Sequence, residues 1–232
     1  MRGYLVFPRK FMKNNSKPFI HPLAEVSPKA KIGAGTKIWA FAQVREDVVI
    51  GKNCVVANGA YIDSQVRIGN RVIIQDKALI YKNVVVEDDV FIGPGACFTN
   101  DPFPRAGSIR DLSGIRWVIG KGASIGANPC VLSEVNIGKY ALVGSDTLVS
   151  KDVPDYALVR GSPGAVVGFV SPKGIPLQLE KESSEKMYFK DKASSFKLTV
   201  NKRSLPNLSH SLSLPGQEIN EAIEKAGHWL LK

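Results

Sequence analysis

A short polar stretch, residues 99–105, carries the side chains of this sequence that are best suited to chemistry. It reads TNDPFPR and places Asn100, Asp101 and Arg105 within a span of six residues. A carboxamide oxygen accepts hydrogen bonds, a carboxylate accepts protons, and a guanidinium binds phosphate in a bidentate fashion. The alternative role for Asn100 is an Asx turn that caps the loop, because Asn and Asp commonly stabilise such turns.

An aliphatic or aromatic residue recurs at every sixth position on both sides of this stretch. The repeat runs without a missed position over residues 20–98 and resumes over residues 119–149. A small or β-branched residue follows most of these positions by four, with Pro129 as the clear exception. A period of six fits neither a helix nor an alternating strand, but it fits a short strand plus a turn. Three such units would form one triangular coil.

Glycine directly follows many of the repeat positions, where a tight corner needs tolerance of positive φ or of crowding. These residues are Gly33, Gly51, Gly69, Gly93, Gly120, Gly126, Gly138 and Gly144. Stacked coils repeat at the spacing of paired strands, about 4.8 Å, so the repeat residues would form aliphatic ladders inside a prism. From Phe98 to Ile119 the chain takes 21 residues where three units need 18. We therefore expect an extruded surface loop over about residues 99–118.

The six-residue pattern resembles that of the hexapeptide-repeat proteins over about residues 20–170. The resemblance implies an all-β fold, a left-handed parallel β-helix, and the handedness comes from the resemblance alone. Most proteins of this kind are acyltransferases that assemble as trimers, with active sites in the grooves between neighbouring prisms. Physical reasoning by itself indicates only that the flat faces of a prism are suited to self-association.

Four stretches narrow the resemblance to one group of these enzymes: residues 74–81, 86–106, 122–128 and 152–163. They are similar to the nucleotide-sugar N-acetyltransferases, which acetylate a 3-amino group on a sugar linked to UDP or dTDP. In that group a phrase close to FTN-x-x-x-PRA opens the active-site loop, and this sequence matches it from Phe98 to Ala106. The resemblance implies acetyl-CoA as co-substrate, with no metal, and a role in polysaccharide biosynthesis.

The acceptor side of the expected site follows from this resemblance. We expect Asn100 to accept a hydrogen bond from the acceptor amine and Asp101 to be a candidate proton acceptor. Further candidate residues for substrate binding are Gln75, Arg105, Trp39, Phe41 and Tyr81. Arg105 suits a pyrophosphate, with loop anchoring as its rival role. In relatives a histidine separates the Trp and Phe, but here Ala40 stands between them.

The donor side is expected along the later coils, where the family places coenzyme A beside small residues. The candidate residues for binding it are Gly126, Ala127, Gly144, Lys151 and Arg160. Glycine and alanine allow a close approach of the pantetheine chain, and the two basic residues would meet the nucleotide phosphates. The alternative for Lys151 and Arg160 is that they are simply solvated basic residues near the end of the prism.

The few histidines favour an amine acceptor over an alcohol. The chain contains His21, His210 and His228 only. Relatives that acetylate hydroxyls use a groove histidine as general base, because an alcohol is a poor nucleophile. A deprotonated amine can attack a thioester directly when it is held close and aligned. A covalent acyl-enzyme on Cys97 is disfavoured because no histidine is nearby in the sequence.

The segments outside the repeat carry no recognisable chemistry. Residues 1–19 read as a basic arm, and residues 171–232 as a β appendage of two or three strands followed by a short helix with its apolar face over residues 219–230. The net charge of +10 is concentrated in these flanks, so nucleic-acid binding is not expected. No stretch is apolar enough for a membrane span or a signal peptide, and three cysteines give no disulfide framework. We expect a cytoplasmic protein.

The sequence therefore predicts an acetyl-CoA-dependent N-acetyltransferase that acts on a nucleotide-linked amino sugar as a homotrimer. Two alternatives stay open at this point. One is the same fold acting on another amine or on a hydroxyl, and the other is a non-catalytic β-helix that serves as a scaffold.

Overall fold

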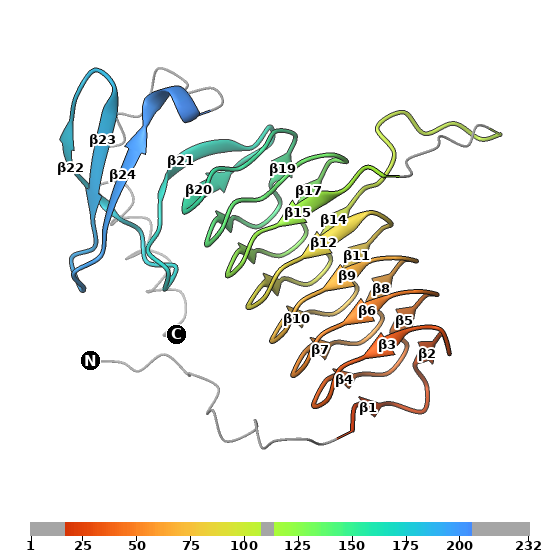
Figure 1. Cartoon of the computed structure of the whole chain (residues 1–232). Helices are drawn as coiled ribbons and strands as arrows, with labels where there is room; N and C mark the ends of the chain where they lie inside the picture. The colour runs from red at the N-terminus through yellow and green to blue at the C-terminus, as the bar shows by residue number, and fades with distance from the viewer. Residues whose placement is uncertain (1–16, 108–113, 206–232) are drawn as a thin grey trace, which may run out of the picture.

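A prism of stacked triangular coils forms the body of the molecule (Figure 1). The computed structural model describes residues 17–107 and 114–205. Most coils contribute one short strand to each of three parallel sheets, which have nine, seven and five strands. The last strand of the nine-stranded sheet is the exception, because it pairs in the antiparallel sense. In the upper coils the five-stranded sheet is continued only by isolated bridges at Ile137 and Val153. The prism is the parallel β-helix that the six-residue repeat predicts, and its left-handed sense is the one that the family resemblance implies.

The strands of the prism are two residues long at most positions. The nine-stranded sheet contains, in spatial order, β1 (Phe19–Ile20), β4 (Lys37–Ile38), β7 (Val55–Val56), β10 (Ile73–Ile74), β13 (Phe91–Ile92), β16 (Ser124–Ile125), β18 (Leu142–Val143), β20 (Ala157–Arg160) and β21 (Ala165–Phe169). The seven-stranded sheet contains β19 (Leu148–Val149), β17 (Cys130–Val131), β14 (Cys97–Phe98), β11 (Leu79–Ile80), β8 (Tyr61–Ile62), β5 (Gln43–Val44) and β2 (Glu25–Val26). The five-stranded sheet contains β15 (Trp117–Ile119), β12 (Val84–Val86), β9 (Arg67–Ile68), β6 (Val49–Ile50) and β3 (Lys31–Ile32).

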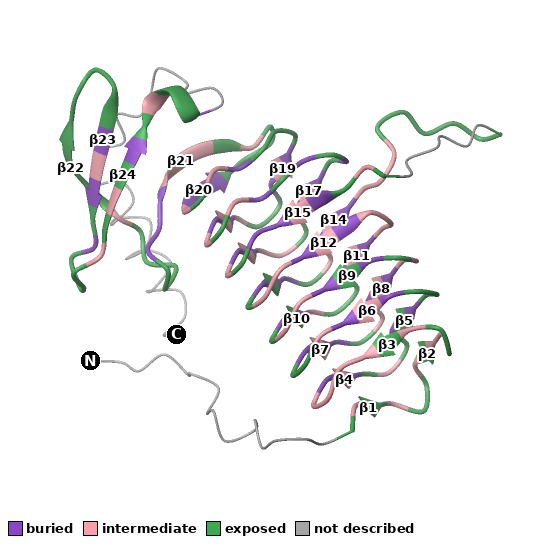
Figure 2. Cartoon of the chain, in the orientation of Figure 1, coloured by how far each residue is buried: buried purple, intermediate pink, exposed green. Residues whose placement is uncertain are grey.

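The repeat residues point inward and form the core. Ile38, Val56 and Ile74 follow one another in register on the nine-stranded sheet, and all three are fully buried. The same burial alternates along every coil of the prism (Figure 2). The first coil is the exception, because no coil lies beneath it among the described residues: Ile20 is 42% exposed, and Val26 and Ile32 are half-buried. The predicted aliphatic ladders are therefore confirmed.

Crowding explains the glycines that follow the repeat residues. A Cβ built on Gly51 would lie 2.4 Å from the carbonyl oxygen of Gly69, and one on Gly33 equally close to that of Gly51. Real Cβ atoms do not approach backbone so closely. Positive φ occurs two residues later instead, at Gly35 (73°) and Asn53 (56°). Of the two reasons that the sequence suggested for these glycines, crowding is the one that applies.

The loop leaves the prism after β14 and projects sideways from it (Figure 1). The ladder resumes at Trp117, which pairs with Val84 and is fully buried. Trp117 and Val118 therefore belong to β15 and not to the loop, whose expected end at residue 118 was two residues too late. The indole Nε1 of Trp117 has no hydrogen-bond partner in the described part of the chain.

A small antiparallel sheet follows the prism, as the alternating pattern predicts. It consists of β22 (Gln178–Glu182), β23 (Lys186–Lys190) and β24 (Lys197–Asn201), and a short 3-10 helix, η2 (Lys202–Ser204), comes next. Met187, Phe189 and Val200 are its buried residues. The helix expected over residues 219–230 and most of the N-terminal arm lie outside the described residues. No helix in the described part is long and apolar enough to cross a membrane.

The corner crowding predicts the effect of adding a single methyl group. Gly51→Ala should lower the free energy of unfolding by about 1–3 kcal/mol, the usual cost of overpacking, because the coil above must shift. Gly168→Ala is the matched control, since a Cβ at that position in β21 meets nothing within 4 Å. Urea denaturation of both variants measures the difference. Equal stability of the two would contradict the crowding argument.

Candidate functional site

The loop begins on a firmly held residue. Phe98 is fully buried, and the backbone N–H of Thr99 donates to the carbonyl of Val131 at 2.9 Å. The chain then leaves the ladder, with Asn100 and Asp101 half-buried at its base and residues 102–107 exposed. The prism thus fixes the base of the loop and presents its polar residues to solvent.

The Asx turn in this loop belongs to Asp101 and not to Asn100. Oδ1 of Asp101 accepts the backbone N–H of Phe103 at 2.8 Å. The side chain of Asn100 makes no hydrogen bond to the described residues, so its carboxamide is available to a ligand. The alternative role considered for Asn100, that of turn former, is thus filled by its neighbour. Asp101 retains one carboxylate oxygen outside the turn.

Arg105 lies exposed on the outer part of the loop. Its Nη1 donates to the carbonyl of Pro104 at 2.9 Å, and no ion pair holds it within the described part of the chain. Its predicted contact with a pyrophosphate remains a prediction.

A polar cluster lies beneath the loop on the seven-stranded sheet, and sequence reasoning found only one member of it, Tyr81. Its centre is Asp63, whose Oδ1 accepts the hydroxyl of Tyr61 at 3.3 Å and the N–H of Ser64 at 2.7 Å. Oδ2 accepts the N–H of Lys82 at 3.2 Å. The rings of Tyr61 and Tyr81 are 5.6 Å apart. We call Tyr61, Asp63 and Tyr81 the tyrosine–aspartate cluster.

The spacing of the coils could have revealed this cluster. Partners in adjacent strands of β8, β11 and β14 are 18 residues apart. Asp63, Tyr81 and Thr99 therefore occupy one column, immediately after those strands. The column runs along the edge between the seven- and five-stranded sheets, which we call the seven–five edge.

Most of the other predicted residues gather on a different edge. Strand pairing places Trp39, Gln75, Gly126, Gly144 and Arg160 in one column at the ends of strands of the nine-stranded sheet. Arg160 is the last residue of β20, and each of the other four directly follows a strand. This column forms the edge between the nine- and seven-stranded sheets, the nine–seven edge. Phe41 and Ala127 belong to the corners that begin at Trp39 and Gly126.

The two glycines of this column are needed by the fold itself. A Cβ on Gly126 would lie 2.7 Å from the backbone nitrogen of Ser145, and one on Gly144 would lie 2.8 Å from Cγ of Arg160. The backbone N–H of Ala127 donates to Oγ of Ser145 at 3.2 Å. Small size at these positions is therefore explained by stacking, and contact with coenzyme A stays a prediction.

The aromatic pair at the lower end of this edge is open to solvent. Trp39 is 39% exposed and packs on Phe19, with ring centroids 5.5 Å apart. Phe41 is 65% exposed and has a φ of 61°, an unfavourable region for a bulky residue. The same positive φ recurs at the equivalent corners of other coils, for example at Asn53 (56°) and Arg71 (58°), so it belongs to the repeat and does not by itself mark a site.

One chain does not bring all the predicted site residues together. Asn100, Asp101, Arg105 and Tyr81 lie on the loop or at the seven–five edge, and Lys151 follows β19 at that same edge. The substrate residues Trp39, Phe41 and Gln75 and the remaining donor residues lie at the nine–seven edge. The whole seven-stranded sheet separates the two groups.

Two other groups are poor candidates for chemistry. Burial, and then the neighbouring thiol of Cys130, raise the pKa of Cys97, which opposes formation of a nucleophilic thiolate. His21 lies in the first coil, where its Nδ1 accepts the N–H of Leu23 at 3.1 Å. Four coils separate it from the loop, a distance of about 19 Å. Among the described residues, no three His, Cys, Asp or Glu side chains are grouped to hold a metal.

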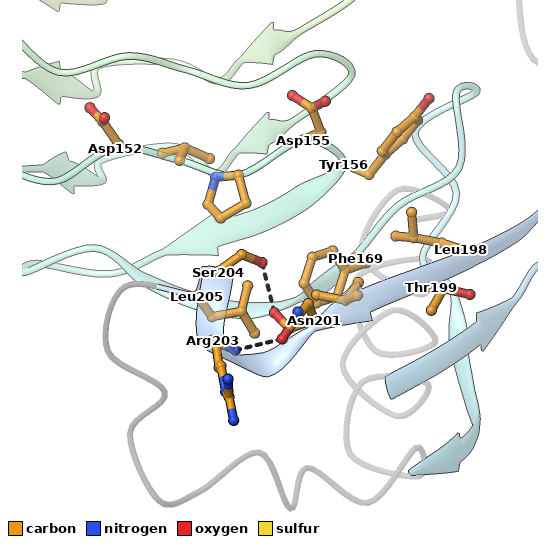
Figure 3. A pocket seen from close by; sticks show the side chains of 13 residues that line it. Asp152, Asp155, Tyr156, Phe169, Leu198, Thr199, Asn201, Arg203, Ser204 and Leu205 are labelled. Carbon is orange, nitrogen blue, oxygen red and sulfur yellow. Dashed lines mark hydrogen bonds between the residues drawn. The ribbon is translucent and has the colours of Figure 1, made fainter. Parts of the chain in front are cut away.

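A cleft of about 860 Å³ lies where the last coil meets β24 and η2 (Figure 3). Its polar residues already serve the fold. Oδ1 of Asn201 accepts the N–H of Arg203 at 3.0 Å, and Oδ1 of Asp155 accepts that of Lys139 at 2.7 Å. None of the predicted site residues lines this cleft. It is a junction between the prism and the appendage.

Comparison with known proteins gives three kinds of match. A family model described as bacterial transferase hexapeptide (six repeats) matches residues 17–64. The chain is 43% identical over 152 residues to the dTDP-3-amino-3,6-dideoxy-α-D-galactopyranose 3-N-acetyltransferase of Aneurinibacillus thermoaerophilus, a match that covers 66% of this chain and 78% of that protein. It is 33% identical over 82 residues to serine acetyltransferase 4 of Arabidopsis thaliana, covering 35% and 23%.

Among solved structures, PerB from Caulobacter crescentus, in complex with CoA and GDP-perosamine, is similar at 24% identity with a TM-score of 0.44. That match covers 66% of this chain and 58% of PerB.

The tyrosine–aspartate cluster predicts a change of stability in alkali. Burial, then the charge of Asp63 and its hydrogen bond, raise the pKa of Tyr61. The unfolded chain therefore loses this proton first, near pH 10, and the free energy of unfolding falls as the pH rises from there through the folded-state pKa. In Tyr61→Phe this fall should be smaller. Urea denaturation between about pH 9 and pH 11 measures it for both proteins.

Asp63→Asn tests whether the charge of Asp63 causes the raised pKa of Tyr61. It removes the charge that raises the pKa of Tyr61, so the fall should shrink in this variant also. The pKa of Tyr156 is raised by burial as well, and its contribution cancels in the comparison. The same fall in wild type and both variants would contradict the hydrogen bond between Tyr61 and Asp63.

Proposed function

Because this chain belongs to the hexapeptide-repeat acyltransferase family, we propose that it transfers an acetyl group from acetyl-CoA to the amine of a nucleotide-linked amino sugar. The observation that carries the proposal is the interruption after Phe98. There the matched phrase FTN-x-x-x-PRA leaves the ladder, and Asn100 stands at its base with an uncommitted carboxamide. The 43% identical relative is named for a dTDP-linked 3-amino sugar. We therefore propose dTDP or UDP as the nucleotide.

The order of residues along the nine–seven edge supports a bound nucleotide sugar. Trp39 lies three coils below the level of β14, or about 14 Å, and Gln75 one coil below it, about 5 Å. An extended ligand with its amine at the level of the loop would place its sugar near Gln75. Its base would lie near Trp39 and Phe41, where aromatic faces are exposed.

Coenzyme A would occupy the same nine–seven edge, above the level of β14, whereas the nucleotide sugar would lie below it. Gly126 and Ala127 follow β16, Gly144 follows β18, and Arg160 ends β20; these are the next strands along the column. The acceptor and the donor would then approach the loop from opposite ends of the prism. Lys151 lies at the seven–five edge, so we propose that it reaches the donor phosphates from the adjoining subunit.

The separation of the two edges supports an assembly in which each site is shared. The loop edge of one subunit would meet the nine–seven edge of its neighbour, a head-to-tail contact that closes into a ring. The outer face of the nine-stranded sheet carries exposed Ile73 and Phe91 in neighbouring strands, with half-buried Val55 one coil below Ile73 in the same register. Such an apolar stripe is suited to self-association. We propose a homotrimer.

The proposed reaction is direct attack by the amine. The neutral nitrogen adds to the thioester carbonyl, the new C–N bond forms, and the C–S bond breaks as coenzyme A leaves as a thiolate. The thiolate accepts the proton that the nitrogen releases, with the free oxygen of Asp101 as the alternative acceptor. Asn100 would accept a hydrogen bond from the amine and aim its lone pair at the carbonyl. The distance of His21 from the loop is consistent with this route.

The tyrosine–aspartate cluster would extend the acceptor site beneath the loop. A carboxylate held by three donors is a fixed acceptor for sugar hydroxyls, and the ring of Tyr81 offers an apolar face to the sugar. Arg105 would bind the pyrophosphate. Acetylated nucleotide sugars supply glycan assembly, so we propose a role in polysaccharide biosynthesis in the cytoplasm.

An acceptor panel tests the proposed function. The protein is incubated with acetyl-CoA and dTDP- or UDP-linked 3-amino sugars, and with serine and an unmodified nucleotide sugar as alcohol controls. Thiol release should occur only with the amino sugars. Coenzyme A at a hundred times its Kd should stabilise the fold by about 2.7 kcal/mol. Turnover of the alcohols alone would contradict the amine proposal.

A mixing experiment tests the shared site. Asn100→Ala should lower kcat/KM by about a hundredfold through misalignment of the amine, and Gln75→Ala should raise the KM for the acceptor. In randomly mixed trimers, an interface is intact when one subunit supplies an unaltered loop edge and its neighbour an unaltered nine–seven edge. About a quarter of the interfaces meet both conditions. Co-expressed variants should therefore recover about that share of wild-type activity. Activity no higher than the mean of the separate variants would contradict a site shared between subunits.

A further inference from the structure

Two cysteines stand next to each other on the outer face of the seven-stranded sheet. Cys97 in β14 and Cys130 in β17 are register partners in adjacent parallel strands. Both are half-buried, and both are free thiols. Cys54, in contrast, is fully buried inside the prism and its Sγ donates to the carbonyl of Gly69 at 3.1 Å. The sequence gives no hint of the pair, because its members are 33 positions apart and the loop lies between them.

The surroundings of the pair are apolar. The same outer column contains Leu79 one coil below Cys97 and Leu148 one coil above Cys130, and both are half-buried. No acidic or basic side chain belongs to these four positions. The thiols therefore lie in an apolar stripe that is open on one side to solvent.

The spacing of the strands decides what could join the two sulfur atoms. In-register neighbours in a parallel sheet are about 4.8 Å apart. That Cα spacing is within the range of disulfides, about 4.4–6.8 Å, but the side chains of in-register parallel neighbours point the same way, so their Cβ atoms are also about 4.8 Å apart. A disulfide requires about 3.5–4.5 Å between the Cβ atoms. Two metal–sulfur bonds of about 2.3 Å, the length known for Zn–S, span about 4.6 Å when they are collinear. The ladder spacing thus fits a linear sulfur–metal–sulfur bridge better than a disulfide.

We propose that Cys97 and Cys130 form a two-coordinate binding site for one soft monovalent cation, of the Cu(I) or Ag(I) type. Thiolates are the ligands that soft cations select, and two of them without a third polar neighbour suit an ion that accepts linear coordination. On binding, each thiol loses its proton to water and forms one sulfur–metal bond. No electron is transferred, so no oxidant or reductant is needed. The ion would connect the two coils between which the loop is inserted.

Native mass spectrometry of the reduced, full-length protein with Ag(I) tests the site. The wild type should bind one tightly held ion per chain. Cys97→Ser and Cys130→Ser should each weaken this binding by more than about a hundredfold, beyond the usual effect of losing an outer partner of a metal site. Cys54→Ser is the matched control and should keep the ion. Binding retained in either outer variant, or lost in Cys54→Ser alone, would overturn the proposal.

Protection of the thiols in the wild type gives a second measurement that needs no variant. One equivalent of Ag(I) should slow alkylation of Cys97 and Cys130 by iodoacetamide together, as read by peptide mass spectrometry. Protection of only one of the two, or a Cys97–Cys130 disulfide formed in air with no protection by Ag(I), would contradict a bridging ion. Neither readout depends on acetyl transfer, so the result is independent of the proposed function.

Discussion

The hydrogen bonds between successive coils hold this molecule in strict register, and the corners leave no room for a β-carbon where those coils meet. A carbonyl oxygen lies 2.4 Å from where a Cβ of Gly51 would be. The strands are mostly two residues long, so a coil displaced at one corner would lose its pairing on the adjoining faces. The inward aliphatic side chains form the buried core, and glycine at the corners allows successive coils to stack closely. All outward positions inherit this spacing, which is why side chains 18 residues apart form columns.

The repeat made most of the fold predictable, and the same arithmetic could have revealed more of the site. A six-residue period specifies which residues point inward, so the buried ladder of Ile38, Val56 and Ile74 follows from sequence. Counting in steps of 18 also assigns Asp63, Tyr81 and Thr99 to one column. Sequence reasoning did not take that step, and Asp63 was missed. Its hydrogen bond with Tyr61 depends on rotamers, which no period specifies.

The features that sequence could not supply are those where the repeat is interrupted. Trp117 occupies a position that is a small or β-branched residue in other coils, and its pairing with Val84 brings the ladder back two residues early. A large ring can enter there because the coil has just been opened by the loop, although a buried indole N–H without a partner costs about 1–3 kcal/mol. The Asx turn fell on Asp101 and not on Asn100. Both residues favour such turns, and only the local backbone decides between them.

A prism can present a reaction site on its surface, because its edges separate the proposed functional groups along two directions. Position along the axis separates the proposed acceptor from the proposed donor, in steps of about 4.8 Å. Around the axis, the polar groups of the loop lie at the seven–five edge, and most of the other predicted residues lie at the nine–seven edge. In the proposed assembly, a second subunit brings the two edges together. The proposed direct attack depends on alignment more than on a strong base. The half-buried carboxamide of Asn100, at the base of a loop that the prism anchors, is suited to that role.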